Sequence, residues 1–372
     1  MPSLINATRG ATSGANGGPS PSPAEAPLFL VVDHYKAGDR DNAIGLASAL
    51  AGTCGGEIVM VRGHLRLAAF TLLLNPWLRW RRRRKVAPSL GRRLWPMLFT
   101  GDAPPERRVA AVVSTLGRGE AVGAFIAALW RVPAIHLGTP KRMDRAFFAA
   151  VVAHQGHIVA PDEIGLPIAS TRLLRAGLPN ASPGDGRRRI LFLLGGDSDE
   201  IRYEDAYWRD LGALIERSAA NPALNITVLT APRTARRVVD DLRRRLADMP
   251  VRLLVFGEPA AKDRYVREIV DADTVITTAE SVSMVSDAIN AGKPVFVLLG
   301  SQVPWSPRIA SFLLQQTKQR RISLFDLRPG ASPDFPSETL IPSDHCWSVD
   351  FLEAVQAAGL FRETPAKGPN QA

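Results

Sequence analysis

The sequence predicts an α/β protein built from two doubly wound domains, each a parallel sheet flanked by helices. Short apolar runs alternate with helix-periodic segments, and this series starts afresh near residue 189, after a stretch of linker composition. A length of 372 residues suits two domains of ordinary size. The expected divisions are a disordered leader at 1–26, an N-terminal domain at 27–180, a linker at 181–188, a C-terminal domain at 189–345, a C-terminal helix at 346–362 and a tail at 363–372.

In the first half, strands are expected wherever a short apolar or β-branched run is bounded by polar or turn residues. These runs lie at 28–33, 57–62, 109–113, 132–137, 151–153 and 156–159. Helix-periodic segments lie at 42–50 and 121–130. Residues 34–41 are expected to form a loop at the carboxyl edge of the first sheet, where a ligand site commonly lies.

The second half repeats the pattern, with strands expected at 189–194, 225–229, 251–256, 274–277 and 295–299 and helices at 206–219, 234–246 and 262–271. A last helix is expected at 350–358. The stretch 274–299 is the most regular βαβ unit, because Val282, Val285 and Ile289 mark one buried helical face. Thr278 or Ser281 can cap this helix, and Gly292 ends it.

The helix after residue 281 is expected to bind an anion, since unpaired N–H groups and the helix dipole favour negative charge at its start. Asp287 follows one turn later, a separation that suits a carboxylate accepting hydrogen bonds from ribose hydroxyls. Gly195, Gly196 and Ser198 directly follow another strand, where glycines let the backbone approach a phosphate and a hydroxyl can donate to it. An ordinary capped helix and an ordinary turn are the alternatives.

Composition excludes several classes of site. Cys54 and Cys346 are far apart and fit no metal-ligand spacing, so neither a disulfide framework nor a structural metal is expected. Six histidines are scattered without a metal-binding pattern. The sequence lacks a phosphate-binding G-x-x-x-x-G-K-[ST] loop, a G-x-S-x-G elbow and a G-x-G-x-x-G after the first strand. No metal and no bound cofactor are therefore expected.

The net charge of +10 is concentrated between residues 58 and 101, which hold ten Arg or Lys and no Asp or Glu. Tryptophans among these arginines suit a segment lying on an anionic membrane surface. A core helix followed by a solvated basic loop is the alternative, and nucleic-acid binding is not expected because no recognised binding module accompanies the segment. The expected membrane-binding residues are Trp77, Arg79, Trp80, Arg81, Arg82, Arg83 and Arg84.

Three motifs resemble a family: S-V-S-M-V-S-D-A-I-N-A-G-K-P-V at 281–295, G-G-D-S-D at 195–199 and N-A-I-G-L-A-S-A-L at 42–50. Together they resemble bacterial relatives of the plant elongated-mitochondria fission factor, which are regarded as glycosyltransferases of GT-B architecture. The first motif is more distantly similar to the lipid-linked N-acetylglucosaminyltransferase of peptidoglycan synthesis. The resemblance implies two Rossmann-like domains facing a cleft, with the sugar donor on the C-terminal one.

The resemblance also implies roles for particular residues. An R-T pair in the family matches Arg233, whose guanidinium can meet a diphosphate, and backbone groups at Phe256 are implied in base recognition. Where the family carries a histidine this chain has Asp39, the candidate base for the acceptor hydroxyl, with His34 as its alternative. Asp199 also departs from the basic residue usual there. The implied donor-binding residues are Gly195, Gly196, Ser198, Arg233, Phe256, Glu280, Ser281, Ser283 and Asp287.

The sequence thus favours a bacterial glycosyltransferase that moves a sugar from a nucleoside diphosphate donor to a lipid-linked or envelope acceptor. A cytoplasmic location, peripheral on the inner face of the membrane, is expected. The alternative is a non-catalytic membrane adaptor of the same fold, because the plant relative is associated with recruiting a fission GTPase.

Overall fold

A computed structural model describes residues 26–360, apart from 34–36, 68, 83–87, 102, 106, 118, 155–160, 301–305 and 342–345. The chain divides into two compact units. The first unit comprises Met1–Arg172 and Trp347–Ala372, and the second unit comprises Leu173–Cys346. The division after Arg172 comes earlier than the expected boundary at residue 180, and the C-terminal helix belongs to the first unit.

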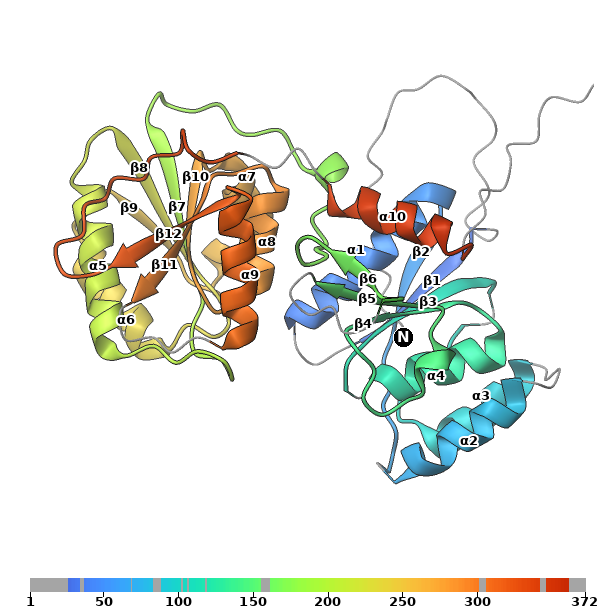
Figure 1. Cartoon of the computed structure of the whole chain (residues 1–372). Coiled ribbons are helices and arrows are strands. Elements are labelled where there is room, and N and C mark those ends of the chain that lie inside the picture. Colours follow the sequence, from blue (N-terminus) through green and yellow to red (C-terminus); the bar gives the residue numbers. More distant parts are fainter. Residues whose placement is uncertain are drawn as a thin grey trace, which may run out of the picture. The chain divides into compact units, whose positions relative to one another are not determined.

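The first unit contains a six-stranded parallel sheet in the order β2-β1-β3-β4-β5-β6 (Figure 1). Its interior strands are almost wholly apolar, as expected for a sheet buried on both faces. The strands are β1 (Leu28–Val32), β2 (Glu57–Val61), β3 (Val109–Thr115), β4 (Ala134–Leu137), β5 (Ala150–His154) and β6 (Ile164–Leu166). The helices are α1 (Ala37–Cys54), α2 (Phe70–Arg82), α3 (Pro88–Leu98), α4 (Gly119–Trp130), the 3₁₀ turn η1 (Arg145–Phe147) and α10 (Trp347–Ala357).

The second unit contains another six-stranded parallel sheet, in the order β12-β11-β10-β7-β8-β9. Its strands are β7 (Arg188–Leu194), β8 (Leu224–Thr230), β9 (Val251–Leu254), β10 (Thr274–Thr278), β11 (Val295–Gly300) and β12 (Ile322–Leu327). The helical elements are η2 (Arg175–Gly177), α5 (Asp205–Ala219), α6 (Arg236–Leu246), η3 (Pro259–Ala261), α7 (Tyr265–Asp271), α8 (Val282–Asn290) and α9 (Pro307–Lys318).

Each sheet has one point at which the strand order reverses. In the first unit the chain runs from β1 outward to β2 and then returns to β3 on the other side of β1. In the second unit it runs from β7 outward through β8 and β9 and then returns to β10, which pairs with β7. Ligands of doubly wound sheets bind outside the carboxyl ends of the strands at this switch point. The switch points therefore lie between β1 and β3 and between β7 and β10.

The structure corrects several expected element bounds. Helix α1 begins at Ala37 rather than at residue 42, so Asp39 lies in its first turn and not in a loop. The sequence analysis did not anticipate β6, α9 or β12. A helix start was nevertheless encoded at α9, because Ser306 caps it and Pro307 occupies its first position. The strand expected at 156–159 lies outside the described residues, as do His34, Arg83, Arg84, the tail and almost all of the leader.

Helices α2 and α3 lie beside α4 (Figure 1), and aromatic side chains pack between them. Trp95 is fully buried, lies 4.8 Å from Phe99 between ring centroids, and donates its indole N–H to the carbonyl oxygen of Gly101. Trp77 stacks on Phe125 at 6.2 Å. Trp77 was expected at a membrane surface, and the structure instead turns it toward the core of its own unit. No helix among the described residues is long and apolar enough to cross a membrane.

Candidate functional site

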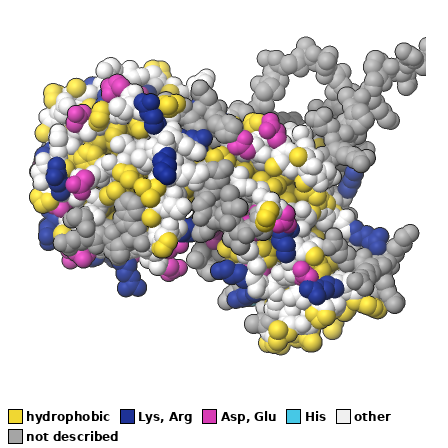
Figure 2. All heavy atoms as spheres, in the orientation of Figure 1, with side chains coloured by type: hydrophobic (Ala, Val, Ile, Leu, Met, Phe, Trp, Pro, Cys, Tyr) yellow, Lys and Arg dark blue, Asp and Glu magenta, His cyan; other side chains and the backbone are white. Residues whose placement is uncertain are grey.

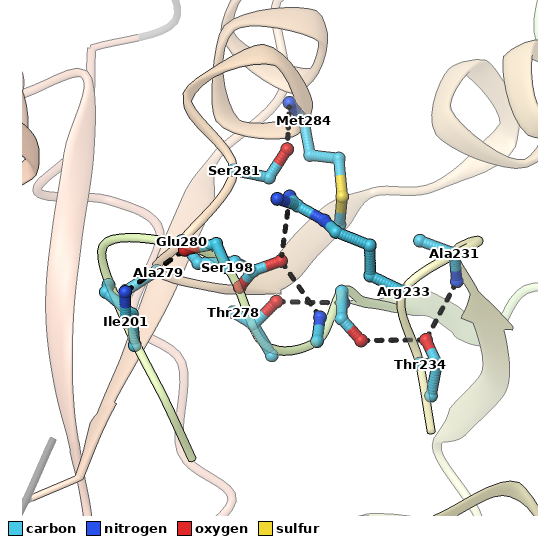
Figure 3. Close-up of polar contacts among 12 residues, drawn as sticks. Ser198, Ile201, Ala231, Arg233, Thr234, Thr278, Ala279, Glu280, Ser281 and Met284 are labelled. Atoms are coloured by element: carbon cyan, nitrogen blue, oxygen red, sulfur yellow. Dashed lines mark hydrogen bonds and ion pairs between the residues drawn. The ribbon is translucent and has the colours of Figure 1, made fainter. Parts of the chain in front are cut away.

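The loops that follow β7, β8 and β10 meet at the switch point of the second unit, and hydrogen bonds join them to one another (Figure 3). The Gly195 N–H donates to Thr278 Oγ1 at 2.9 Å, which ties the β7 loop to the end of β10. Thr234 Oγ1 lies 2.7 Å from the Gly195 carbonyl oxygen and donates there, which ties the β8 loop to the β7 loop. These contacts fix the backbone that would face a ligand at this edge.

Glycine is required at both positions directly after β7, because neighbouring loops approach the backbone there too closely for a Cβ atom. A Cβ on Gly195 would lie 1.5 Å from Glu280 Oε1, and a Cβ on Gly196 would lie 1.9 Å from the carbonyl oxygen of Arg233. Contacts of this length are impossible for real side chains, and the second one is with backbone that cannot easily move. The glycines were expected to let a backbone approach a phosphate. Their structural role is to let the three loops approach each other.

Glu280 lies at the centre of the site with a buried side chain. Its Oε1 accepts the N–H of Gly196 at 3.1 Å, and its Oε2 accepts the hydroxyl of Tyr203 at 2.7 Å. The sequence analysis placed Glu280 among the donor-binding residues, in contact with sugar hydroxyls. In the structure both carboxylate oxygens accept hydrogen bonds inside the protein, so Glu280 positions the loops, and its contact with sugar hydroxyls stays a prediction.

Tyr203 was missed by the sequence analysis, although it is a buried aromatic residue at the end of the β7 loop. Its hydroxyl donates to Glu280 and accepts the N–H groups of Ala279, at 3.0 Å, and Glu280, at 3.2 Å. Burial raises the pKa of Tyr203 well above its usual value, with further contributions from Tyr207 and the Glu280 carboxylate. Tyr203 therefore stays neutral and serves as a fixed hydrogen-bond donor to Glu280.

Arg233 reaches the site from the loop between β8 and α6. Its guanidinium lies 3.6 Å from Glu280 Oε1, and its side chain is 47% exposed. Figure 3 shows this side chain pointing toward Glu280 and the first turn of α8. One face of the guanidinium is thus held by a buried carboxylate while the rest is open to solvent, an arrangement in which Arg233 can still pair with an anion.

Helix α8 begins at this same place. Ser281 is its N-cap, and Ser281 Oγ accepts the N–H of Met284 at 3.4 Å, which confirms one of the two caps expected from the sequence. The N–H groups of Val282 and Ser283, in the first turn, have no acceptor within the helix. Ser283 is half-buried. The helix start therefore supplies backbone donors next to the Arg233 guanidinium.

The remaining expected donor-site residues have partners of their own. Ser198 Oγ accepts the N–H groups of Glu200 and Ile201 at 3.2 and 3.1 Å, which leaves its hydroxyl hydrogen to donate elsewhere. Asp287 Oδ2 accepts the hydroxyl of Tyr265 at 2.6 Å. The N–H of Phe256, an implied contact to the base, donates to Thr230 Oγ1 at 2.9 Å while its side chain is exposed.

Helix α9, also missed from the sequence, fastens the far end of the β7 loop. Arg308 donates to both oxygens of Glu200, at 2.6 Å each, and Ser306 Oγ donates to the same carboxylate at 3.2 Å. Bidentate pairs of this kind are among the stronger ion pairs in proteins. Residues 195–200 are therefore held at both ends, by Thr278 and Glu280 at one and by α9 at the other.

In the first unit, Asp39 lies in the first turn of α1, after β1 and therefore at the carboxyl edge of its own sheet. Asp39 is half-buried. His34 lies outside the described residues. Within the described residues, no group of three His, Cys, Asp or Glu side chains is arranged to hold a metal ion.

A family model described as Mitochondrial fission ELM1 matches residues 37–358 of the chain. The S. aureus MnaA–UDP co-structure is similar to the chain, with a TM-score of 0.51 at 11% identity, covering 92% of this chain and 100% of that one. A UDP-N-acetylglucosamine 2-epimerase structure gives a TM-score of 0.50 at 13% identity, covering 92% and 100%. No curated protein sequence matches the chain significantly.

The two structural likenesses show the fold: two Rossmann-like units in the GT-B plan, as the sequence predicted. At such low identity they carry no residue roles. The family match covers most of the chain and includes both units.

Proposed function

The chain belongs to the Mitochondrial fission ELM1 family, and from that premise we propose that it is a GT-B glycosyltransferase using a nucleoside diphosphate sugar. The donor binds the second unit at the switch point between β7 and β10. The acceptor is membrane-associated, either a lipid-linked intermediate or an envelope polysaccharide.

The observation that carries the proposal is the placement of Arg233 beside the start of α8. A half-exposed guanidinium and unpaired helix N–H groups converge at the position where doubly wound sheets bind nucleotides. The guanidinium can form paired hydrogen bonds to a diphosphate. The buried Glu280 holds this guanidinium in place before any ligand arrives, which reduces the ordering that binding requires.

The chemical role of this site is to stabilise the diphosphate as it leaves the sugar. When the bond between the sugar and the diphosphate breaks, negative charge grows on the phosphate oxygens, and fixed N–H groups with Arg233 stabilise that charge. The hydroxyl of Ser198 adds one more donor, and Asp287 accepts from the ribose. In the first unit, Asp39 takes the proton of the attacking acceptor hydroxyl.

The test is donor binding by the full chain, measured as thermal stabilisation across a panel of nucleotide sugars and then by calorimetry. Arg233→Ala is expected to weaken binding of the best donor by about 1.5–3 kcal/mol, the range for hydrogen bonds to a charged group. Arg233→Lys keeps the charge but not the paired hydrogen-bond geometry. Its affinity for the donor should therefore lie between those of the wild type and Arg233→Ala. The matched control is Arg236→Ala, since the Arg236 side chain is 95% exposed on the same polypeptide stretch.

Equal affinities in Arg233→Ala and Arg236→Ala, with melting temperatures unchanged, would contradict the donor site. If no nucleotide sugar stabilises the protein at all, the non-catalytic adaptor becomes the better description. That second candidate is favoured by one observation, the description of the family, which names mitochondrial fission and no transfer reaction.

A further inference from the structure

The outward face of α2 is apolar where a surface helix is normally polar. Leu72 is 80% exposed and Leu73 is 70% exposed, and Trp80, two turns further along, is 47% exposed. The opposite face of α2 is already buried, with Leu74 and Leu78 in the core of the first unit. A helix that is apolar on two faces needs a second partner, because exposed leucines in contact with water are unfavourable.

The neighbouring segments extend this face. In α3, Met97 is 67% exposed while Trp95 is buried, so α3 is also apolar on two sides. Leu67 is 58% exposed, and the backbone pairing of Arg66 with Leu98 places this segment beside the end of α3. Figure 2 shows hydrophobic side chains gathered over the part of the first unit where Figure 1 places α2 and α3. We call Leu67, Leu72, Leu73, Trp80 and Met97 the apolar patch.

The segment that carries the apolar patch has charged residues of one sign only. No Asp or Glu occurs between residues 58 and 101, and the described cations there include Arg66 and Arg93, both exposed. Arg79, one of the expected membrane contacts, pairs through its guanidinium with Asp144 at 2.5 Å. Exposed leucine, methionine and tryptophan beside unbalanced arginines are the composition of surfaces that bind at the boundary of an anionic bilayer.

We propose that the apolar patch on α2 and α3 is a docking surface for an anionic phospholipid bilayer. Leu72, Leu73 and Met97 enter the acyl boundary, and the exposed Arg66 and Arg93 meet the phosphate headgroups. The expected membrane contact is thereby moved from Trp77, which packs inward, to exposed leucine and methionine side chains. The proposal goes beyond sugar transfer and requires no bound nucleotide.

The experiment is sedimentation of the full chain with vesicles of phosphatidylcholine alone or mixed with phosphatidylglycerol, without nucleotide. The wild type should bind the anionic vesicles and bind neutral ones at least about tenfold more weakly. Binding should decline toward 1 M salt, where charges are screened beyond about 3 Å. Because Leu72 and Leu73 are exposed, Leu72→Ser with Leu73→Ser should leave the melting temperature unchanged and reduce binding at least about tenfold.

The matched control is Leu314→Ser, a 51% exposed leucine on α9 of the second unit, which should bind vesicles as the wild type does. Equal binding by the double variant and the wild type would overturn the proposal, as would equal binding to both vesicle types or no binding to either. If the wild type does not bind vesicles and the double variant has a different molar mass in solution from the wild type, the patch would be assigned to a second copy of the chain instead. None of these results depends on whether the protein uses a nucleotide sugar.

Discussion

Glu120 in the first unit and Glu280 in the second are buried carboxylates that follow equivalent strands, each the first strand beyond the switch point. Glu120 follows β3 and accepts four backbone N–H groups, those of Gly117, Lys141, Arg142 and Met143. Three of these belong to the loop after β4, away from the switch point. Glu280 instead bridges across the switch point to the β7 loop, and it faces Arg233.

The contrast shows which of the two carboxylates positions a charged side chain. A carboxylate whose oxygens accept several backbone N–H groups holds those loops together and has a structural role. Glu280 is shared between a backbone N–H, a tyrosine hydroxyl and a half-exposed guanidinium that remains open to solvent. The four hydrogen bonds to Glu120 therefore all come from backbone N–H groups, while Glu280 holds a half-exposed cation in place.

The largest effect should come from removing Glu120. Glu120→Ala leaves the buried N–H of Met143 and three partly buried backbone N–H groups without their acceptor, and we expect the first unit to lose about 2–4 kcal/mol of unfolding free energy. Hydrogen exchange with urea unfolding would localise the loss to the first unit. Glu353→Ala, at an exposed position of α10, should change stability by less than about 0.5 kcal/mol. A loss of similar size in both variants would show that the backbone cage is not what stabilises this edge.

The first unit also contains a buried histidine, His136 in β4, which should make the stability of this unit sensitive to acid. Burial, followed by the nearby Arg145, lowers the pKa of His136 from 6.5 to about 3 in the folded chain. Below pH 6.5 the unfolded chain binds a proton that the folded chain does not, so stability falls as pH falls through this window. From pH 7 to 5 the first unit should lose about 2 kcal/mol. Urea unfolding of wild type and His136→Gln at pH 7 and 5 checks this, and parallel losses in both proteins would refute the assignment.

The smallest effect concerns the tyrosine that distinguishes Glu280 from Glu120. Tyr203→Phe removes the donor to Glu280 and the acceptor for two backbone N–H groups, and should cost the second unit about 1–2 kcal/mol. Tyr207→Phe is the comparison variant, since the contact of its hydroxyl to the Leu298 carbonyl is long, at 3.4 Å. Differential scanning calorimetry of both variants makes the comparison. If Tyr207→Phe lowers the melting temperature as much, the Tyr203 contact has no special role in holding Glu280.

Local patterns sufficed for the parts of the fold that depend on neighbouring residues. The βαβ unit through α8 was predicted almost to the residue, because periodicity, the Ser281 cap and the Gly292 end are all local. The role of Glu280 could not be predicted, because it depends on Tyr203, a residue far away in sequence and close only in the folded chain. The orientation of Trp77 has the same explanation: composition shows that a tryptophan lies among arginines, and only packing on Phe125 shows that it faces inward.

The position of helix α10 at the end of the described chain determines the order in which the two units are completed during translation. This helix is the last described element, it packs on α1 and β6 of the first unit, and its Trp347, Phe351 and Val355 are buried. The whole second unit is therefore inserted between two pieces of the first. During translation, the second unit is complete before α10 leaves the ribosome, so the domain that begins first is finished last. A nascent chain interrupted ahead of residue 347 would carry a finished second unit beside a first unit with α1 and β6 uncovered.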